Sequence, residues 1–106
     1  MIYLKEYKTE TGVIIAACDE ELLGNIYSDG VILLDLEKYS GFYKGDLITE
    51  QAASERIIPD ELHSANIVGR RSVGICIERG VARKADVMHV KGVPFLQIYH
   101  IEYEKS

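Results

Sequence analysis

The chain has 106 residues, of which 47% are apolar and 27% charged, and its formal net charge is −5. This length suits about one domain, so we expect residues 1–106 to form one, and the composition is that of a soluble globular protein rather than a disordered acidic tail. The longest apolar runs fall well short of the roughly 20 residues that cross a bilayer, which excludes a membrane protein. The first charged residues are Lys5 and Glu6, too near the N-terminus for the apolar core of a signal peptide to precede them. We therefore expect a cytoplasmic protein.

Charge is unevenly distributed along the chain. Residues 1–64 carry 5 Lys and Arg against 13 Asp and Glu, whereas residues 65–106 carry 7 against 4. The acidic first part argues against general DNA or RNA binding, because such binding usually needs a basic domain. The second part predicts a local basic patch, for which the alternative interpretation is an ordinary solvated surface. Its members are Arg70, Arg71, Arg79, Arg83, Lys84 and Lys91.

The first third of the chain reads as strands and tight turns. "IYLKEYK" alternates as a strand does, and "TETG" turns it into the fully apolar "VIIAAC", which together predict a hairpin. In "DEELLG" we expect Asp19 to cap a helical turn, which explains three adjacent carboxylates without a metal. After the Asp29-Gly30 turn, residues 31–36 predict another strand.

An aromatic loop and a helix follow. Tyr39, Phe42 and Tyr43 are spaced by small and polar residues in "EKYSGFYKGD". They are either an exposed contact surface or a lid folded onto the core, and the sequence leaves both interpretations open. "TEQAASERII" then predicts a helix over residues 49–57, with Thr49 as its N-cap.

The C-terminal part predicts two strands, "ADVMHV" and "VPFLQIYHIEY", joined by a turn at Lys91-Gly92. The second of these, from Phe95 to Tyr103, is a candidate edge strand through which a homodimer would pair. The three histidines, His63, His89 and His100, lack the spacing of metal ligands, so we expect neither a metal nor a cofactor.

The stretch "SANIVGRRSVGICIERG" predicts one helix over residues 65–79, because small and apolar residues recur in it at spacings of three and four. Ser64 is its expected N-cap and Gly80 its C-terminal stop. Gly69 inside such a helix has two explanations: close packing against a neighbour, or a helix that begins near Arg70 and offers free N–H groups to an anion. The residues that hold phosphate and magnesium in a P-loop are missing.

The two cysteines, Cys18 and Cys76, are expected to be reduced and buried. A reactive Cys18 is the alternative, since it directly precedes the turn that Asp19 is expected to cap, although the carboxylates beside it oppose a thiolate.

Three segments in order, "GVIIAACDEELLG", "SANIVGRRSVGICIERG" and "VKGVPFLQIYH", give the chain a resemblance to the archaeal proteins grouped as domain of unknown function four-two-four. The resemblance implies a cytoplasmic protein of about this length with one α+β domain, and a helix from Asn66 to Gly80. It implies no activity and no catalytic residues.

We therefore predict an α+β fold, with a mixed or antiparallel sheet of about five or six strands and the helices at 49–57 and 65–79 on one face. The predicted function is a non-enzymatic binding or accessory module for an acidic protein surface or structured RNA. The alternative is a small-molecule enzyme or thiol-dependent sensor that binds an anion near Cys18. The candidate binding residues are Asn66, Arg70, Arg71, Arg79, Arg83, Tyr39, Phe42 and Tyr43.

Overall fold

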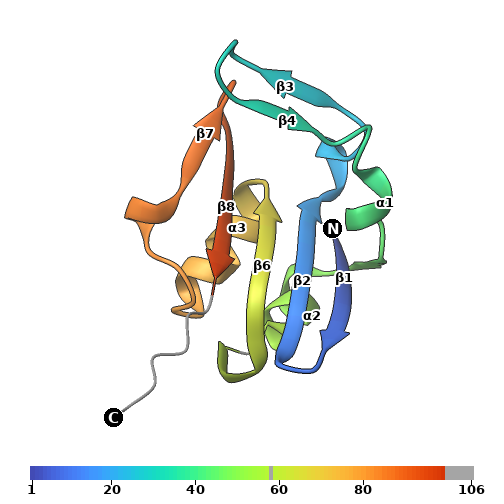
Figure 1. Cartoon of the computed structure of the whole chain (residues 1–106), viewed down its shortest axis with the longest axis vertical. Helices are drawn as coiled ribbons and strands as arrows, with labels where there is room; N and C mark the ends of the chain where they lie inside the picture. The colour runs from blue at the N-terminus through green and yellow to red at the C-terminus, as the bar shows by residue number, and fades with distance from the viewer. Residues whose placement is uncertain (58, 100–106) are drawn as a thin grey trace.

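The computed structural model describes residues 1–57 and 59–99, and within them six strands form one mixed sheet (Figure 1). In spatial order the strands are β5 (Asp46–Ile48), β1 (Ile2–Thr9), β2 (Gly12–Asp19), β6 (Leu62–Val68), β8 (Val93–Tyr99) and β7 (Met88–Val90). The central neighbours β2 and β6 run parallel, and the other neighbouring pairs are antiparallel. The predicted α+β class and strand number are confirmed.

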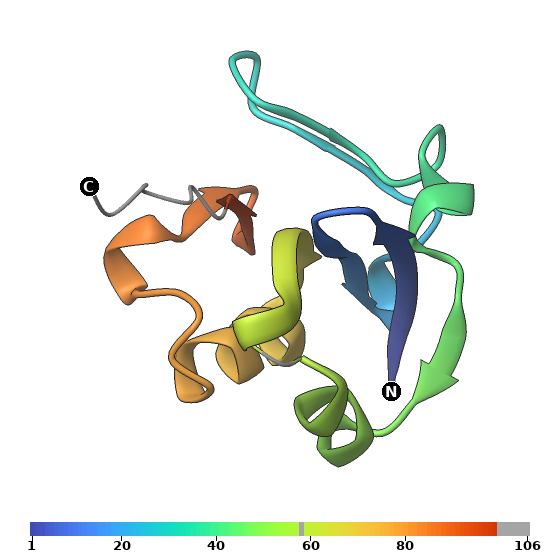
Figure 2. The same ribbon diagram turned by 60° about the horizontal axis from the view of Figure 1, so that its bottom comes forward.

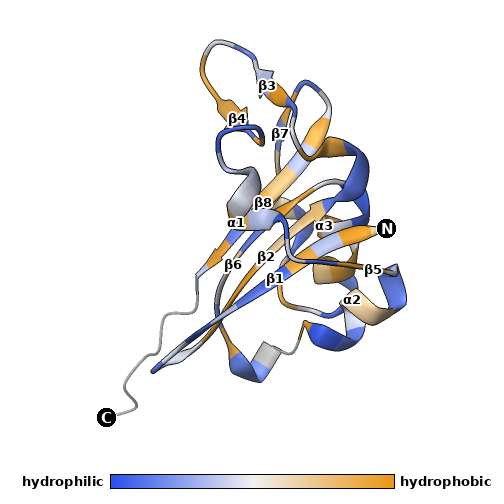
Figure 3. Ribbon diagram, turned by 90° about the vertical axis from the view of Figure 1, so that its right-hand side faces the viewer, coloured by the Kyte–Doolittle hydropathy of each residue, from blue (hydrophilic) through white to orange (hydrophobic). Residues whose placement is uncertain are grey.

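Two layers cover the sheet, one on each face. The helices α2 (Glu50–Arg56) and α3 (Arg70–Glu78) lie on one face, as predicted, while α1 (Ser40–Tyr43) lies on the other (Figure 3). A separate hairpin of β3 (Ile26–Ser28) and β4 (Leu33–Asp35) projects as an arm over the face that carries α1 (Figure 2). Single turns of 3-10 helix complete the described chain: η1 (Glu20–Leu22), η2 (Pro59–Glu61) and η3 (Lys84–Asp86).

Strand β2 is apolar from residue 13 to residue 18, as expected of a strand whose two faces are both covered. Ile15 and Ala17 belong to the core under α2 and α3, whereas Ala16 and Cys18 belong to the core under α1 and the β3–β4 arm. A one-residue slip of this strand would exchange the two sets, so the packing fixes its register. No helix among the described residues is long and apolar enough to cross a membrane.

The predicted turns and the Thr49 cap are confirmed. Gly12 has φ +145° at the turn between β1 and β2, and Lys91 and Gly92 have φ values of 51° and 78° between β7 and β8. Positive φ at both central residues matches the right-handed twist of a hairpin. The Thr49 side chain accepts a hydrogen bond from the Ala52 N–H, 3.1 Å away, and Ala53 is buried on the inner side of α2.

The single helix predicted for residues 65–79 is wrong in its first part. Residues up to Val68 belong to β6, Gly69 turns the chain with φ +107°, and α3 begins at Arg70. Layers on both faces of the sheet bury β6, with Ala65 and Ile67 in one core and Val68 in the other, so the alternation typical of a strand is lost. Ser64 is therefore a strand residue rather than an N-cap, whereas Gly80 does end α3, with φ +74°.

The predicted edge strand is only partly an edge. Phe95 pairs with Val68 on one side and with Met88 on the other, so β8 is enclosed at this end. Among the described residues, Gln97 and Tyr99 pair with β6 alone. Residues 100–103 of the predicted strand, and His100 with them, lie outside the described residues, and dimerisation through this strand stays a prediction.

Candidate functional site

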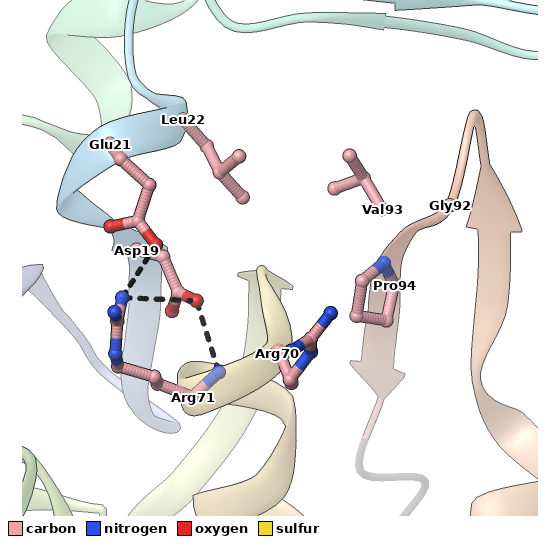
Figure 4. A pocket seen from close by; sticks show the side chains of 8 residues that line it. All are labelled: Asp19, Glu21, Leu22, Arg70, Arg71, Gly92, Val93 and Pro94. Carbon is pink, nitrogen blue, oxygen red and sulfur yellow. Dashed lines mark hydrogen bonds and ion pairs between the residues drawn. The ribbon is translucent and has the colours of Figure 1, made fainter.

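The parallel strands β2 and β6 end side by side, and α3 begins where β6 ends (Figure 1). This is the place where open α/β sheets bind ligands, because parallel strands leave a crevice at their carboxyl ends. A cavity of about 310 Å³ opens here (Figure 4). Its lining residues are Asp19, Glu21, Leu22, Arg70, Arg71, Gly92, Val93 and Pro94.

Asp19 fills the N-terminus of α3. Its carboxylate accepts hydrogen bonds from the Arg71 N–H (3.0 Å), the Ser72 N–H (2.9 Å) and the Ser72 hydroxyl (2.7 Å). The prediction that Asp19 caps its own turn is wrong, because no side-chain bond to η1 forms and the carboxylate caps a helix 50 residues away in the chain. Two of the N–H groups that an external anion would need, those of Arg71 and Ser72, are thus bonded within the protein.

Gly69 is required by this arrangement. Its φ of +107° lies in the region that favours glycine, and a Cβ at this position would overlap the Asp19 carboxylate. Of the two explanations offered by the sequence, both hold in part: α3 does begin at Arg70, and close contact is the reason for the glycine. We call Asp19, Gly69, Arg71 and Ser72 the cap site.

The two neighbouring arginines differ in their surroundings. The Arg71 guanidinium pairs with Glu21 and lies 3.8 Å from Asp19 and 3.7 Å from Glu50. Arg70 has no ion pair among the described residues, and its side chain extends into the space between Asp19 and Pro94 (Figure 4). Of these two arginines, Arg70 is therefore the one that is available to a ligand.

Arg70 also lines a second cavity, of about 460 Å³, between α3 and the β7–β8 hairpin. The cations Arg70 and Lys84 and the imidazole of His89 lie over an apolar floor of Val73, Ile77, Val87 and Pro94, and Gly74 and Gly92 complete the lining. Within residues 1–57 and 59–99, no carboxylate lines this cavity. We call these nine residues the basic groove. The sequence placed Lys84 only in a general patch and gave His89 no binding role.

A third cavity, of about 400 Å³, lies on the opposite face of the sheet, between the β3–β4 arm, α1 and the strands β6 and β8. We call it the amide cavity, and its lining residues are Leu33, Leu34, Asp35, Leu36, Tyr39, Phe42, Tyr43, Asn66 and Gln97. Four of the predicted binding residues meet here, because Asn66 joins the three aromatics and not the arginines with which it was grouped. Gln97 was not predicted.

The aromatic residues combine both interpretations that the sequence left open. The Tyr43 side chain is 8% exposed, and Phe42 stacks on Tyr7 with ring centroids 5.2 Å apart, so these two form a lid on the core. Tyr39 is 54% exposed and presents its ring at the surface. The split follows from the short helix α1, which turns successive side chains in different directions.

The remaining candidate arginines do not join these sites. The Arg79 guanidinium donates to the Ile57 carbonyl, 3.3 Å away, and Arg83 lies 3.7 Å from Asp86. Neither lines the three cavities described above. Among the described residues, no group of three or more His, Cys, Asp or Glu is placed to hold a metal ion.

Both cysteines are free and fully buried, as predicted. Burial, together with the negative charges of Asp19 and Glu21, raises the pKa of the Cys18 thiol to about 12. Burial also raises the pKa of Cys76 to about 12. Cys18 packs under the β3–β4 arm and does not line the cavity that holds Arg70 and Arg71. This position opposes the formation of a reactive thiolate.

The chain is similar to one protein family in sequence and to a solved structure in fold. The family model described as "Protein of unknown function (DUF424)" matches residues 7–101. A solved structure, described as the crystal structure of an uncharacterized conserved protein from Methanopyrus kandleri, is similar with a TM-score of 0.74 and 21% sequence identity. The similarity covers 99% of this chain and 98% of the other. None of the curated proteins compared with the chain matches it.

Proposed function

We propose that this chain, which belongs to the DUF424 family, is a non-enzymatic binding module whose basic groove takes an acidic segment of a partner protein. The observation that carries the proposal is the lining of the groove. In a chain with a net charge of −5, Arg70, Lys84 and His89 border an apolar floor with no carboxylate among the lining residues. A partner segment with alternating acidic and apolar side chains fits such a surface in both charge and polarity.

The shape of the positive surface favours a protein segment over RNA. Structured RNA is bound through many phosphate contacts along an extended basic surface. Here Arg71, Arg79 and Arg83 are engaged with protein oxygens, and of the six cations of the predicted patch two, Arg70 and Lys84, line the groove. Arg70 suits a carboxylate partner because its planar guanidinium forms two parallel hydrogen bonds with a carboxylate.

The alternative, an anion-binding enzyme or thiol-dependent sensor, receives less support. Its anion site at the start of α3 is filled by Asp19, and its nucleophile Cys18 is buried with a raised pKa. A catalytic thiol needs a lowered pKa and access to substrate. The geometry supports binding at the surface beside this helix rather than chemistry at its N-terminus.

Fluorescence anisotropy with a short labelled peptide of alternating Glu and Leu tests the proposal. We expect the affinity to fall as the salt concentration rises from about 0.05 to about 0.2 M. Salt in this range screens charges over a Debye length of about 10 Å. Arg70→Ala is expected to weaken binding about tenfold, the effect of losing a charge-assisted hydrogen bond. A peptide of alternating Lys and Leu is expected not to bind.

Arg83→Ala is the matched control, since it removes the same charge from an exposed arginine outside the groove. It is expected to change the affinity less than about twofold. Equal losses in the two variants would mean attraction by overall charge and would contradict a specific groove. Binding of a stem-loop RNA through Arg70, with no binding of the acidic peptide, would replace the proposed partner class.

A further inference from the structure

The amide cavity differs from the basic groove in charge. Among the described residues that line it, Asp35 is the only one with a full charge, and that charge is negative. One Asp35 oxygen, Oδ1, already accepts hydrogen bonds from the N–H groups of Glu37 and Lys38. An anionic ligand is therefore disfavoured here, and a neutral ligand with polar edges suits the lining.

The floor of the cavity holds two side-chain amides on neighbouring strands. Asn66 and Gln97 are direct partners in the register of β6 and β8, and the Gln97 Nε2 donates to the Asn66 Oδ1, 3.2 Å away. This bond uses one donor and one acceptor. It leaves an N–H donor on Asn66 and a carbonyl acceptor on Gln97 unused. If both amides are turned over, the free donor lies on Gln97 and the free acceptor on Asn66. The pair thus offers a donor beside an acceptor in either orientation.

Tyr43 forms part of the wall of the cavity. It is 8% exposed and lines the cavity together with Phe42 and Leu36, so this side of the site is largely apolar. Burial and, to a smaller extent, Cys18 raise the pKa of Tyr43 to about 12, so its hydroxyl is protonated at neutral pH.

An aromatic ring at the rim supplies the remaining element. Tyr39 is 54% exposed, and the Lys38 ammonium lies 5.4 Å from its ring centroid. Planar bases stack on such rings, and amide side chains recognise their edges, which carry a donor next to an acceptor. A peptide group also has a donor and an acceptor and is planar, but its face is much smaller than that of an aromatic base, so it stacks less on the ring.

We propose that the amide cavity binds a nucleobase, with Asn66 and Gln97 reading its polar edge and Tyr39 stacking on its face. The site lies across the sheet from the basic groove and does not depend on the function proposed there. The base belongs either to a free nucleoside or to a single-stranded RNA, and the chemistry of recognition is shared by both.

Nuclear magnetic resonance of the ¹⁵N-labelled protein tests the proposal at the amides themselves. The chain has four side-chain amides, at Asn25, Gln51, Asn66 and Gln97, so their NH₂ signals are few enough to follow individually. On titration with adenosine, guanosine, cytidine or uridine, we expect the signals of Asn66 and Gln97 to shift with at least one nucleoside. Those of Asn25 and Gln51 serve as internal controls and are expected to stay in place. Unchanged Asn66 and Gln97 signals with all four nucleosides and with a mixed-sequence single-stranded RNA would overturn the proposal.

Variants connect the shift to the stated contacts. Tyr39→Ala is expected to weaken binding about tenfold, whereas Tyr39→Phe, which keeps the ring, is expected to retain it. Tyr99→Ala is the matched control, because Tyr99 is 67% exposed and does not line the cavity.

Asn66→Leu removes one half of the polar pair at similar volume and is expected to weaken binding about tenfold. Binding that survives both Tyr39→Ala and Asn66→Leu would contradict the site. Binding of the RNA but of no nucleoside, with the same dependence on Tyr39 and Asn66, would support it and identify RNA as the source of the base.

Discussion

The cap site and the amide cavity both contain polar groups, but at the cap site these groups bond to one another and in the amide cavity some of them stay open. At the cap site, the buried Asp19 carboxylate accepts hydrogen bonds from two N–H groups and a hydroxyl, so these donors are not available to a ligand. In the amide cavity, the Asn66 and Gln97 pair leaves a donor and an acceptor open. A helix N-terminus that faces a crevice is therefore not by itself a binding site, because here Asp19 occupies its donors.

The difference also predicts where stability and binding lie. Groups that are buried and fully bonded contribute to folding, since removing one leaves its partners unpaired. Groups that remain open to a cavity contribute little to folding and are available to a ligand. Four changes test this division, from the largest expected effect to the smallest.

Asp19→Ala is expected to lower the free energy of unfolding by about 3 kcal/mol, because it removes a cap and leaves the Ser72 hydroxyl without its partner. Urea denaturation measures the change. Asp19→Asn, which keeps an acceptor of the same shape, is expected to cost about 1 kcal/mol. A loss below about 0.5 kcal/mol for Asp19→Ala would show that the cap site does not stabilise the fold.

Gly69→Ala is expected to lower the free energy of unfolding by about 2 kcal/mol, since the added Cβ meets Asp19 and the φ of +107° is unfavourable for alanine. Combining it with Asp19→Ala isolates the contact. We expect the double variant to lose less than the sum of the two single changes, because the overlap disappears with the carboxylate. Additive losses would show that backbone conformation alone makes glycine necessary.

The two buried thiols make the free energy of unfolding depend on pH. Each folded thiol has a pKa of about 12, raised from an ordinary value of 9.0, so the folded state keeps a proton that the unfolded chain loses first. Their contribution to stability is therefore complete below pH 9 and falls as the pH rises toward 12. We expect the variant carrying Cys18→Ala and Cys76→Ala to lose less stability over this range, measured by urea denaturation at each pH. Fast labelling of native Cys18 at neutral pH would contradict the buried position.

Asn66→Leu is expected to change the free energy of unfolding by less than about 0.5 kcal/mol, because its bond to Gln97 is exposed and the other polar groups of the pair are unpaired. The same variant is expected to abolish most nucleobase binding. A loss of stability comparable to that of Asp19→Ala would make the amide pair a structural element and weaken the comparison.

Local patterns in the sequence predicted much of the fold. The hairpin of β1 and β2, the Thr49 cap and the Lys91-Gly92 turn depend on residues adjacent in the chain, whose conformational preferences act locally. The boundary between β6 and α3 was missed because burial of β6 on both faces erased its alternation. Gly69 was the available signal, and its role depends on Asp19, which is distant in sequence.

The sites were less predictable than the fold. Asn66 and Gln97 become neighbours only through the pairing of β6 with β8, and no local pattern connects them. Arg70 and Arg71 look equivalent in sequence, but the side of α3 on which each lies decides that Arg71 pairs with Glu21 while Arg70 faces two cavities. Such distinctions depend on the tertiary arrangement.

A single titration series tests most directly the claim that the two faces bind different chemistry. The ¹⁵N-labelled protein is titrated with the Glu-Leu peptide and with the nucleoside that binds, first separately and then together, while the Arg70 Nε–H signal and the side-chain signals of Asn66 and Gln97 are followed. The account predicts that the peptide shifts Arg70 alone, that the nucleoside shifts Asn66 and Gln97 alone, and that both bind at once. Competition between the two ligands, or shifts of the same signals by both, would contradict it.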